Sequence, residues 1–187
     1  MKLKLFCVAM MTLFATTFVS AQNEFGKGDM ALNINYGMGN FDVEDNVFQH
    51  SLGASLEYGI LDGIIKGKGT VAVGGQVGFG FGSMTEQGVE INCTRFRIAT
   101  RGVFHYQFIP QLDTYAGITL GIVDIDKVEL ESDIYEFGEE PEEKETRFVG
   151  PVAFAGARYM FSDSFGLNVE LSWDSFAMVG LGVTFKL

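Results

Sequence analysis

The chain has 187 residues and a formal net charge of −11. A protein this acidic is not expected to bind nucleic acid tightly, because neutralising phosphates requires clustered Lys and Arg. Its length predicts a single domain. It has two cysteines, Cys7 and Cys93, and Cys7 lies in the segment assigned below to an export signal. We therefore expect no disulfide within the mature chain.

The N-terminal segment has the features of an export signal. Two lysines form a basic start, residues 5–18 are apolar, and small residues precede a cleavage site after Ala21. We predict a signal peptide at residues 1–21 and one mature domain at residues 22–187. The alternative is an uncleaved anchor, which is disfavoured because a spanning helix needs roughly 18 or more apolar residues.

The mature sequence contains eight segments in which apolar residues alternate with polar or small ones. Side chains of a strand point alternately to its two faces, so each segment presents one apolar face and one polar face. In the fifth segment, for example, Ala116, Ile118, Leu120 and Ile122 share the apolar face. In the sixth, Val149 is placed on the apolar face. The expected strands cover residues 30–38, 48–60, 70–81, 95–108, 115–122, 149–161, 165–174 and 179–187.

The alternation favours a closed barrel in a membrane. The longest uncharged stretch, residues 69–85, is rich in glycine, which disfavours a transmembrane helix. In lipid, a sheet satisfies its backbone hydrogen bonds only by closing on itself, and an even number of strands suits an antiparallel barrel. We predict an all-β fold, an eight-stranded antiparallel up-and-down transmembrane β-barrel. A soluble sandwich or lipocalin-like barrel would point its aromatic side chains inward. Ten strands would require the acidic segment 124–146 to cross the membrane.

The connections and the aromatic residues agree on an orientation. Tight turns at Pro110-Gln111 and residues 162–164 lie on one side, and the longest connection, 124–146, lies on the other. Bacterial outer-membrane barrels have short periplasmic turns, longer extracellular loops and an aromatic belt at each lipid interface. The expected periplasmic belt is Tyr58, Tyr106, Phe108, Tyr159, Phe161, Phe165 and Phe185, and the expected outer belt is Phe48, Phe79, Phe81, Phe96 and Trp173.

In this pattern the chain resembles the small eight-stranded outer-membrane barrels of the OmpX type and the OmpA transmembrane domain. The last segment, Val179 to Leu187, is similar to the C-terminal strand that the barrel-insertion machinery recognises in that family. The resemblance therefore implies an insertion signal formed by Val183, Phe185 and Leu187. The family usually ends in an aromatic residue, whereas this chain ends in Leu187. Pro151, which cannot donate a ladder hydrogen bond, is expected to mark a bulge or the outer rim of the sixth strand.

The predicted inward face carries an unusual number of charged residues. Eight strands enclose an interior just wide enough to be filled by side chains, and buried charges need partners. We expect Glu170 to pair with Arg97 or Arg101, and Glu57 to pair with Arg158 or His105. The predicted lumen network, a structural plug, consists of Glu57, Arg95, Arg97, Arg101, His105, Arg158, Glu170, Asp174 and Lys186. A narrow or gated ion path through the same residues is the functional alternative.

The connection 124–146 holds eleven acidic residues and two lysines. It is predicted to be an acidic extracellular surface loop, and three interpretations stay open. It could be a solvated charge run, a weak divalent-cation site without the spacing of an EF-hand, or a hairpin that docks a partner by edge pairing, as in the OmpX type. Its acidic residues are Asp124, Asp126, Glu129, Glu131, Asp133, Glu136, Glu139, Glu140, Glu142, Glu143 and Glu145.

No motif for catalysis, a metal centre or a cofactor occurs in the sequence. His50 and Ser51 are adjacent, so their side chains point to opposite faces of a strand and cannot pair there. We expect a non-enzymatic protein of a Gram-negative outer membrane with a structural or surface-interaction role through its acidic loop. A small-solute or ion channel is the alternative, followed by a lipid A-modifying enzyme. The expected partners are outer-membrane lipid and lipopolysaccharide, the insertion machinery, and a surface protein or divalent cation.

Overall fold

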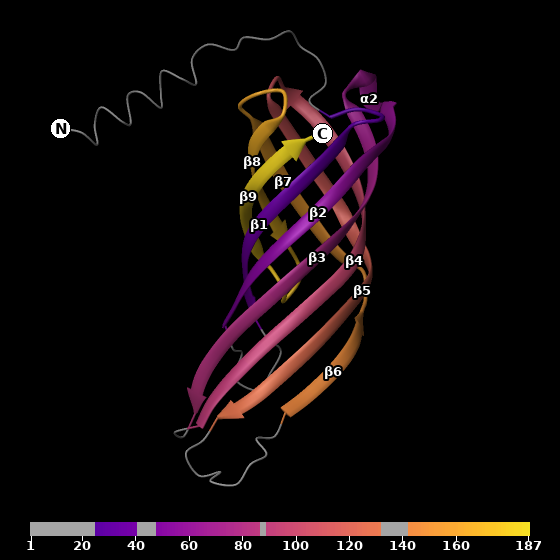
Figure 1. Cartoon of the computed structure of the whole chain (residues 1–187). Coiled ribbons are helices and arrows are strands. Elements are labelled where there is room, and N and C mark those ends of the chain that lie inside the picture. The colour runs from indigo at the N-terminus through magenta and orange to yellow at the C-terminus, as the bar shows by residue number, and fades with distance from the viewer. Residues whose placement is uncertain (1–24, 41–47, 87–88, 132–141) are drawn as a thin grey trace, which may run out of the picture.

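The computed structural model describes residues 25–40, 48–86, 89–131 and 142–187, almost all of which lie in antiparallel strands (Figure 1). The predicted signal peptide and its cleavage site lie outside the described residues. The elements are β1 (Met30–Asn40), β2 (Phe48–Gly63), α2 (Ile64–Gly67), β3 (Gly69–Glu86), β4 (Val89–Ile109), β5 (Leu112–Glu131), β6 (Glu142–Val149), β7 (Val152–Met160), β8 (Phe165–Ser172) and β9 (Val179–Lys186). No helix among the described residues is long and apolar enough to cross a membrane.

The strands close into a barrel. Each pairs with its neighbour in the order β4-β3-β2-β1-β9-β8-β7-β5, and the pairing of β4 with β5 completes the cylinder. Strands β6 and β7 pair with successive parts of the same edge of β5, and Gly150 and Pro151 separate them. They therefore form one interrupted wall strand at the place where Pro151 predicted an irregularity. Counted in this way, the wall has eight strands, and the predicted fold class is confirmed.

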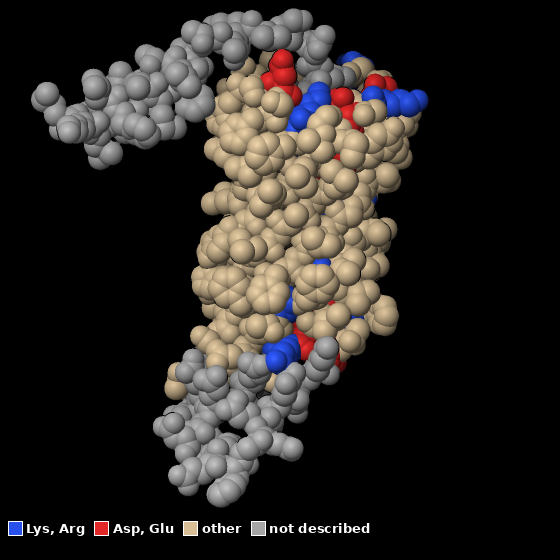
Figure 2. Space-filling model, in the orientation of Figure 1, with Lys and Arg blue, Asp and Glu red and all other residues tan. Residues whose placement is uncertain are grey.

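The two faces of the wall differ as the alternation predicts. Large apolar side chains such as Leu52, Val77 and Leu181 are exposed on the outside, whereas polar and charged side chains are buried inside. Figure 2 shows a broad uncharged band around the barrel, with acidic and basic residues gathered toward its two ends. A soluble sandwich or lipocalin-like barrel would have to bury this apolar surface, so this alternative does not fit the structure.

One aromatic belt forms a continuous row at the end of the barrel where β1 starts and β9 finishes, here called the terminal end. Ring centroids are separated by 5.2 Å between Tyr159 and Phe161, 6.3 Å between Phe161 and Phe165, and 5.6 Å between Phe165 and Phe185. Rings prefer such offset or tilted contacts, and amphipathic rings are enriched at lipid interfaces.

The opposite end, here called the extension end, is longer on one side of the barrel. Strands β3, β4, β5 and β6 run on past the neighbouring strands, as Figure 1 shows at the lower end. Within the described residues, the stretch 82–86 of β3 pairs only with β4, and β6 pairs only with β5. The described parts of the predicted loop 124–146 therefore form a hairpin of β5 and β6, which is the hairpin among the three interpretations left open for this segment.

A bulge in β5 corrects the predicted phase of the fifth strand. Leu120 pairs with Thr100 and Val123 pairs with Ile98, so Gly121 and Ile122 together oppose a single residue of β4. Gly121 has a φ of 59°, which glycine adopts readily, and the extra residue inverts the alternation beyond it. Ile122, predicted to face outward, is fully buried inside. Val149, also predicted outward, packs against the same buried cluster.

Candidate functional site

The lumen is built around a row of cationic side chains on β4. Arg95, Arg97, Arg101 and His105 all lie on the inward face, because they are separated by even numbers of residues along the strand. The neighbouring strands supply the acidic partners. The inward row thus forms stacked layers of ion pairs between the two ends of the barrel.

The layer nearest the extension end contains Arg95 and Arg97. Arg97 binds Asp124 through two parallel contacts of 2.6 Å, Nε to Oδ1 and Nη2 to Oδ2, and its Nη1 binds Asp174. Arg95 binds Asp126 in the same manner at 2.6 and 3.1 Å, and Arg147 Nη2 lies 3.0 Å from Asp126 Oδ2. Such bidentate charged pairs fix geometry more strongly than single contacts.

This layer corrects the sequence prediction for two residues. Asp124 and Asp126 were assigned to the acidic surface loop, but Asp124 is completely buried and Asp126 is mostly buried. The bulge at Gly121 is the reason, because it turns both carboxylates inward. Asp174, assigned to the seventh predicted strand, lies just beyond β8 and still reaches Arg97.

The middle layer joins β4 to β8. Arg101 Nη2 lies 2.6 Å from Glu170 Oε2, so Glu170 pairs with one of its two predicted partners. The Arg101 guanidinium also lies 3.9 Å from the ring centroid of Phe154, and its Nη1 donates to Gln76 at 3.2 Å. Arg101 therefore spans the lumen between carboxylate, amide and aromatic ring.

The layer nearest the terminal end is centred on Glu57, which is fully buried. Arg158 Nη2 donates to Glu57 Oε2 at 2.6 Å, and His105 Nε2 lies 3.8 Å from the same oxygen. Both predicted partners of Glu57 thus surround it. His105 Nδ1 contacts Asp113 Oδ2 at 2.9 Å, and Arg158 Nε lies 3.6 Å from the same oxygen.

Lys186 does not join these layers. Its Nζ lies 2.9 Å from Asp29 Oδ2, and both side chains are partly exposed. The pair lies at the mouth of the barrel, because Lys186 is the last residue of β9 and Asp29 immediately precedes β1. Its placement in the buried network is therefore wrong.

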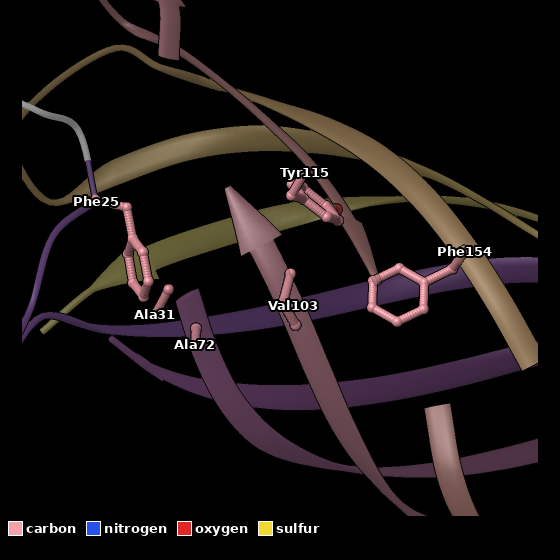
Figure 3. Packing of buried hydrophobic residues seen from close by; sticks show 6 residues of the cluster. All are labelled: Phe25, Ala31, Ala72, Val103, Tyr115 and Phe154. Carbon is pink, nitrogen blue, oxygen red and sulfur yellow. The ribbon is translucent and has the colours of Figure 1, made fainter. Parts of the chain in front are cut away.

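Aromatic rings fill the space that the ion pairs leave. Figure 3 shows Phe25, Tyr115 and Phe154 inside the barrel with Ala31, Ala72 and Val103. Phe25 lies near the terminal end, where its carbonyl accepts a hydrogen bond from Thr70 Oγ1 at 2.9 Å and its ring centroid lies 4.4 Å from that of His105. Sequence reasoning missed Phe25, because it precedes the first strand and belongs to no alternating pattern.

The remaining acidic residues of segment 124–146 lie in the extension or outside the described residues. Glu129 and Glu131 belong to β5, and Glu142, Glu143 and Glu145 belong to β6. The described residues form no cluster of three or more potential metal ligands. The acidic positions outside the described residues are Asp133, Glu136, Glu139 and Glu140.

Two further predicted features have clear positions. Val183 and Phe185 lie on one face of β9, which pairs with both β8 and β1, and Leu187 follows directly after it. Ser51 is buried in the lumen, whereas His50 lies on the outside, where its Nδ1 hydrogen-bonds with the hydroxyl of Tyr36. The two adjacent side chains therefore lie on opposite sides of the wall.

No protein-family model matches the chain, and no curated protein sequence matches it significantly. Several solved structures do match. Ail, the attachment invasion locus protein of Yersinia pestis, aligns with a TM-score of 0.54 and 13% identity over 86% of this chain and 99% of Ail. Neisserial surface protein A aligns with a TM-score of 0.53 and 10% identity over 85% of this chain and 96% of its own. At these identities the similarity establishes a shared fold, that of the small eight-stranded outer-membrane barrels.

Proposed function

We propose that this chain is a non-enzymatic integral protein of a bacterial outer membrane, which binds partners at the cell surface through its acidic strand extension. The observation that carries this proposal is the open edge of β6. In the described part of the chain, β6 has a strand neighbour only on the side of β5.

The membrane placement rests on the outer surface of the barrel. An uncharged apolar band surrounds the wall, and charged residues gather beyond it at both ends (Figure 2). A closed sheet with an apolar outside and a polar inside satisfies its backbone hydrogen bonds in lipid. We propose that outer-membrane lipid and lipopolysaccharide contact this band, and that the insertion machinery reads Val183, Phe185 and Leu187.

The extension is suited to binding an extended peptide. An open strand edge offers unpaired backbone donors and acceptors, which a partner strand satisfies by adding to the sheet. The hairpin around this edge is strongly acidic, so the partner that it favours carries Lys and Arg. In one matched structure Ail binds a heparin analogue, sucrose octasulfate. A polysulfated ligand would be repelled by the acidic extension, so we propose a basic protein segment instead.

The test compares intact protein with a variant in which residues 127–144 are replaced by a short Gly-Ser turn. The probe is a fluorescent peptide of alternating Lys and Thr, which is basic and prone to extended structure. We expect binding by the intact protein in nanodiscs, loss of binding by the shortened variant, and no binding of the matching Glu-Thr peptide. Equal binding of the Lys-Thr peptide by both proteins would overturn the proposal.

A matched charge variant separates edge pairing from simple attraction. This variant removes three charges of β6 and keeps the backbone edge of the strand. It combines Glu142→Gln, Glu143→Gln and Glu145→Gln. We expect weaker and less salt-dependent binding, but not its abolition, because the backbone edge remains. Calcium is included as a competitor. Protection of the hairpin from protease by calcium alone would favour the divalent-cation role instead.

A further inference from the structure

A polar chamber lies within the lumen on the extension side of the Arg101–Glu170 pair. It has a volume of about 60 Å³, and its lining includes Asn35, Ser51, Ser55, Gln76, Arg101 and Glu170. Two polar atoms, Asn35 Oδ1 and Arg101 Nε, are buried without a hydrogen-bond partner in the protein. Unpaired buried polar atoms are destabilising, and a polar cavity of this size satisfies them by holding small hydrogen-bonding molecules.

The side chain of Phe176 forms part of the chamber wall. It belongs to the connection between β8 and β9, residues 173–178, and is 6% exposed, whereas Trp173 in the same connection is 75% exposed. The connection thus points one aromatic side chain into the barrel and another away from it. Side-chain alternation could not predict these two orientations, because residues 173–178 do not form a strand.

Several contacts hold Phe176 in this position. Its N–H donates to Asp174 Oδ1 at 2.8 Å, and its carbonyl accepts from Gln49 Nε2 at 2.7 Å. The Arg97 guanidinium lies 4.5 Å from the ring centroid, which is a favourable cation–π distance. The backbone and the ring are therefore fixed by separate partners.

The wall opposite the ring is shaped to receive it. A Cβ atom at Gly78 of β3 would lie 2.5 Å from Cζ of Phe176, closer than real contacts allow. The ring therefore occupies space that only glycine leaves at this position. This complementarity indicates a specific closed state of the connection.

We propose that Phe176 is a lid over a one-sided chamber, which takes up small uncharged polar molecules from the extension end of the barrel. The occupants are uncharged because the two charged groups of the chamber, Arg101 and Glu170, already neutralise each other, and the other lining groups are amides and hydroxyls. Toward the terminal end, the layers around Glu57 and Phe25 fill the lumen. The chamber is thus a pocket rather than a path through the barrel.

Asp174 connects the lid to Arg97, and this contact can be lost without leaving the buried arginine unpaired. Arg97 keeps both contacts with Asp124 when its contact with Asp174 is lost. Asp174 is accordingly a positioning residue, which orients Phe176 from outside the chamber. Its removal loosens the lid and leaves the lining intact.

The test measures access to the chamber by a small thiol reagent. Cys93, the free cysteine among the described residues, is first removed by Cys93→Ser. In this background, Ser51→Cys places a single thiol in the chamber. Folded protein in detergent micelles is treated with methyl methanethiosulfonate, which is small and uncharged. We expect slow modification with Phe176 present and at least about tenfold faster modification in Phe176→Ala, since reaction then no longer waits for local opening.

Trp173→Ala is the matched control, since it removes an aromatic ring from the same connection but outside the chamber. It is expected to leave the modification rate unchanged, whereas Asp174→Asn is expected to give an intermediate rate. Ser55→Cys repeats the experiment at a second lining position, in case Ser51→Cys fails to fold. Equal rates with and without Phe176 at both positions would overturn the lid, and ion conductance by Phe176→Ala in planar bilayers would overturn the closed pocket.

Discussion

Glu57 of β2 and Arg158 of β7 meet inside the barrel, where Nη2 of the arginine lies 2.6 Å from Oε2 of the carboxylate. Both side chains are buried, although the residues are 101 positions apart in sequence. Each charge is removed from water and depends on the other for compensation. The pair therefore locks two distant strands into one register of the closed sheet.

Replacing one member of this pair is expected to be strongly destabilising. Glu57→Ala leaves the guanidinium of Arg158 without its closest carboxylate, so we expect the free energy of unfolding to fall by about 3–5 kcal/mol. Urea-induced unfolding in detergent or lipid vesicles measures the change.

The control replaces both members by apolar residues of similar size, Glu57→Leu with Arg158→Met. It removes both buried charges at once, so most of the lost stability is expected to return. If the double variant is as unstable as Glu57→Ala, an orphaned buried charge does not explain the loss.

Glu170→Ala tests the middle layer, where the carboxylate binds Arg101. We expect a lower unfolding temperature in detergent, because Arg101 loses its shortest ionic contact. The loss should be smaller than for Glu57→Ala, since Glu170 is partly exposed and Arg101 also lies 3.7 Å from Glu57. No ion conductance should appear in planar bilayers, because the other layers still fill the lumen. An unchanged unfolding temperature would argue against a structural plug.

The alternation of side chains was sufficient to predict most of the barrel. It placed Arg95, Arg97 and Arg101 on one inward face, and it paired Glu57 and Glu170 with the correct small sets of partners. This worked because the spacing of two residues per repeat is a property of any regular strand. The position of each charged residue along its strand, between the two ends of the barrel, then limited which side chains could pair.

The alternation was misleading where the backbone departs from a regular strand. A bulge at Gly121 inverted the phase of β5 and concealed Asp124 and Asp126 among the residues of an acidic loop. Phe25 and Phe176 lie before or between strands, so no periodic pattern contains them. These residues fill the lumen, and finding them required the closed fold.

Gly121 is expected to be required for the inverted phase. Gly121→Ala places a Cβ on a backbone with a φ of 59°, which costs about 1–2 kcal/mol for an ordinary residue. We expect this loss in urea unfolding. Gly102→Ala is the matched control on the neighbouring strand, where a Cβ would meet no atom within 4 Å. Equal effects of the two substitutions would show that the bulge is not constrained by Gly121.

The pair at the mouth of the barrel should contribute far less than the pairs inside. Lys186 and Asp29 are both partly exposed, so water and salt screen their attraction. Lys186→Met is expected to lower the free energy of unfolding by about 1 kcal/mol or less, and raised salt should reduce even this difference. Glu57→Ala measured in parallel should keep its full effect in salt. A large, salt-insensitive loss for Lys186→Met would mean that the mouth is closed to water.

The two acidic positions that the sequence placed together on the surface should behave in opposite ways. Asp124 is buried and holds Arg97 by two contacts, whereas Glu145 is an exposed residue of β6. Asp124→Ala should therefore be destabilising by several kcal/mol, on the order of other orphaned buried charges. Glu145→Ala should change stability by about 0.5 kcal/mol or less. Asp124→Asn keeps an oxygen acceptor for Arg97 but loses the charge, so it should lie between the two in urea unfolding. If Asp124→Ala is as mild as Glu145→Ala, the carboxylate of Asp124 is exposed to water, and the bulge does not build a layer of ion pairs in the lumen.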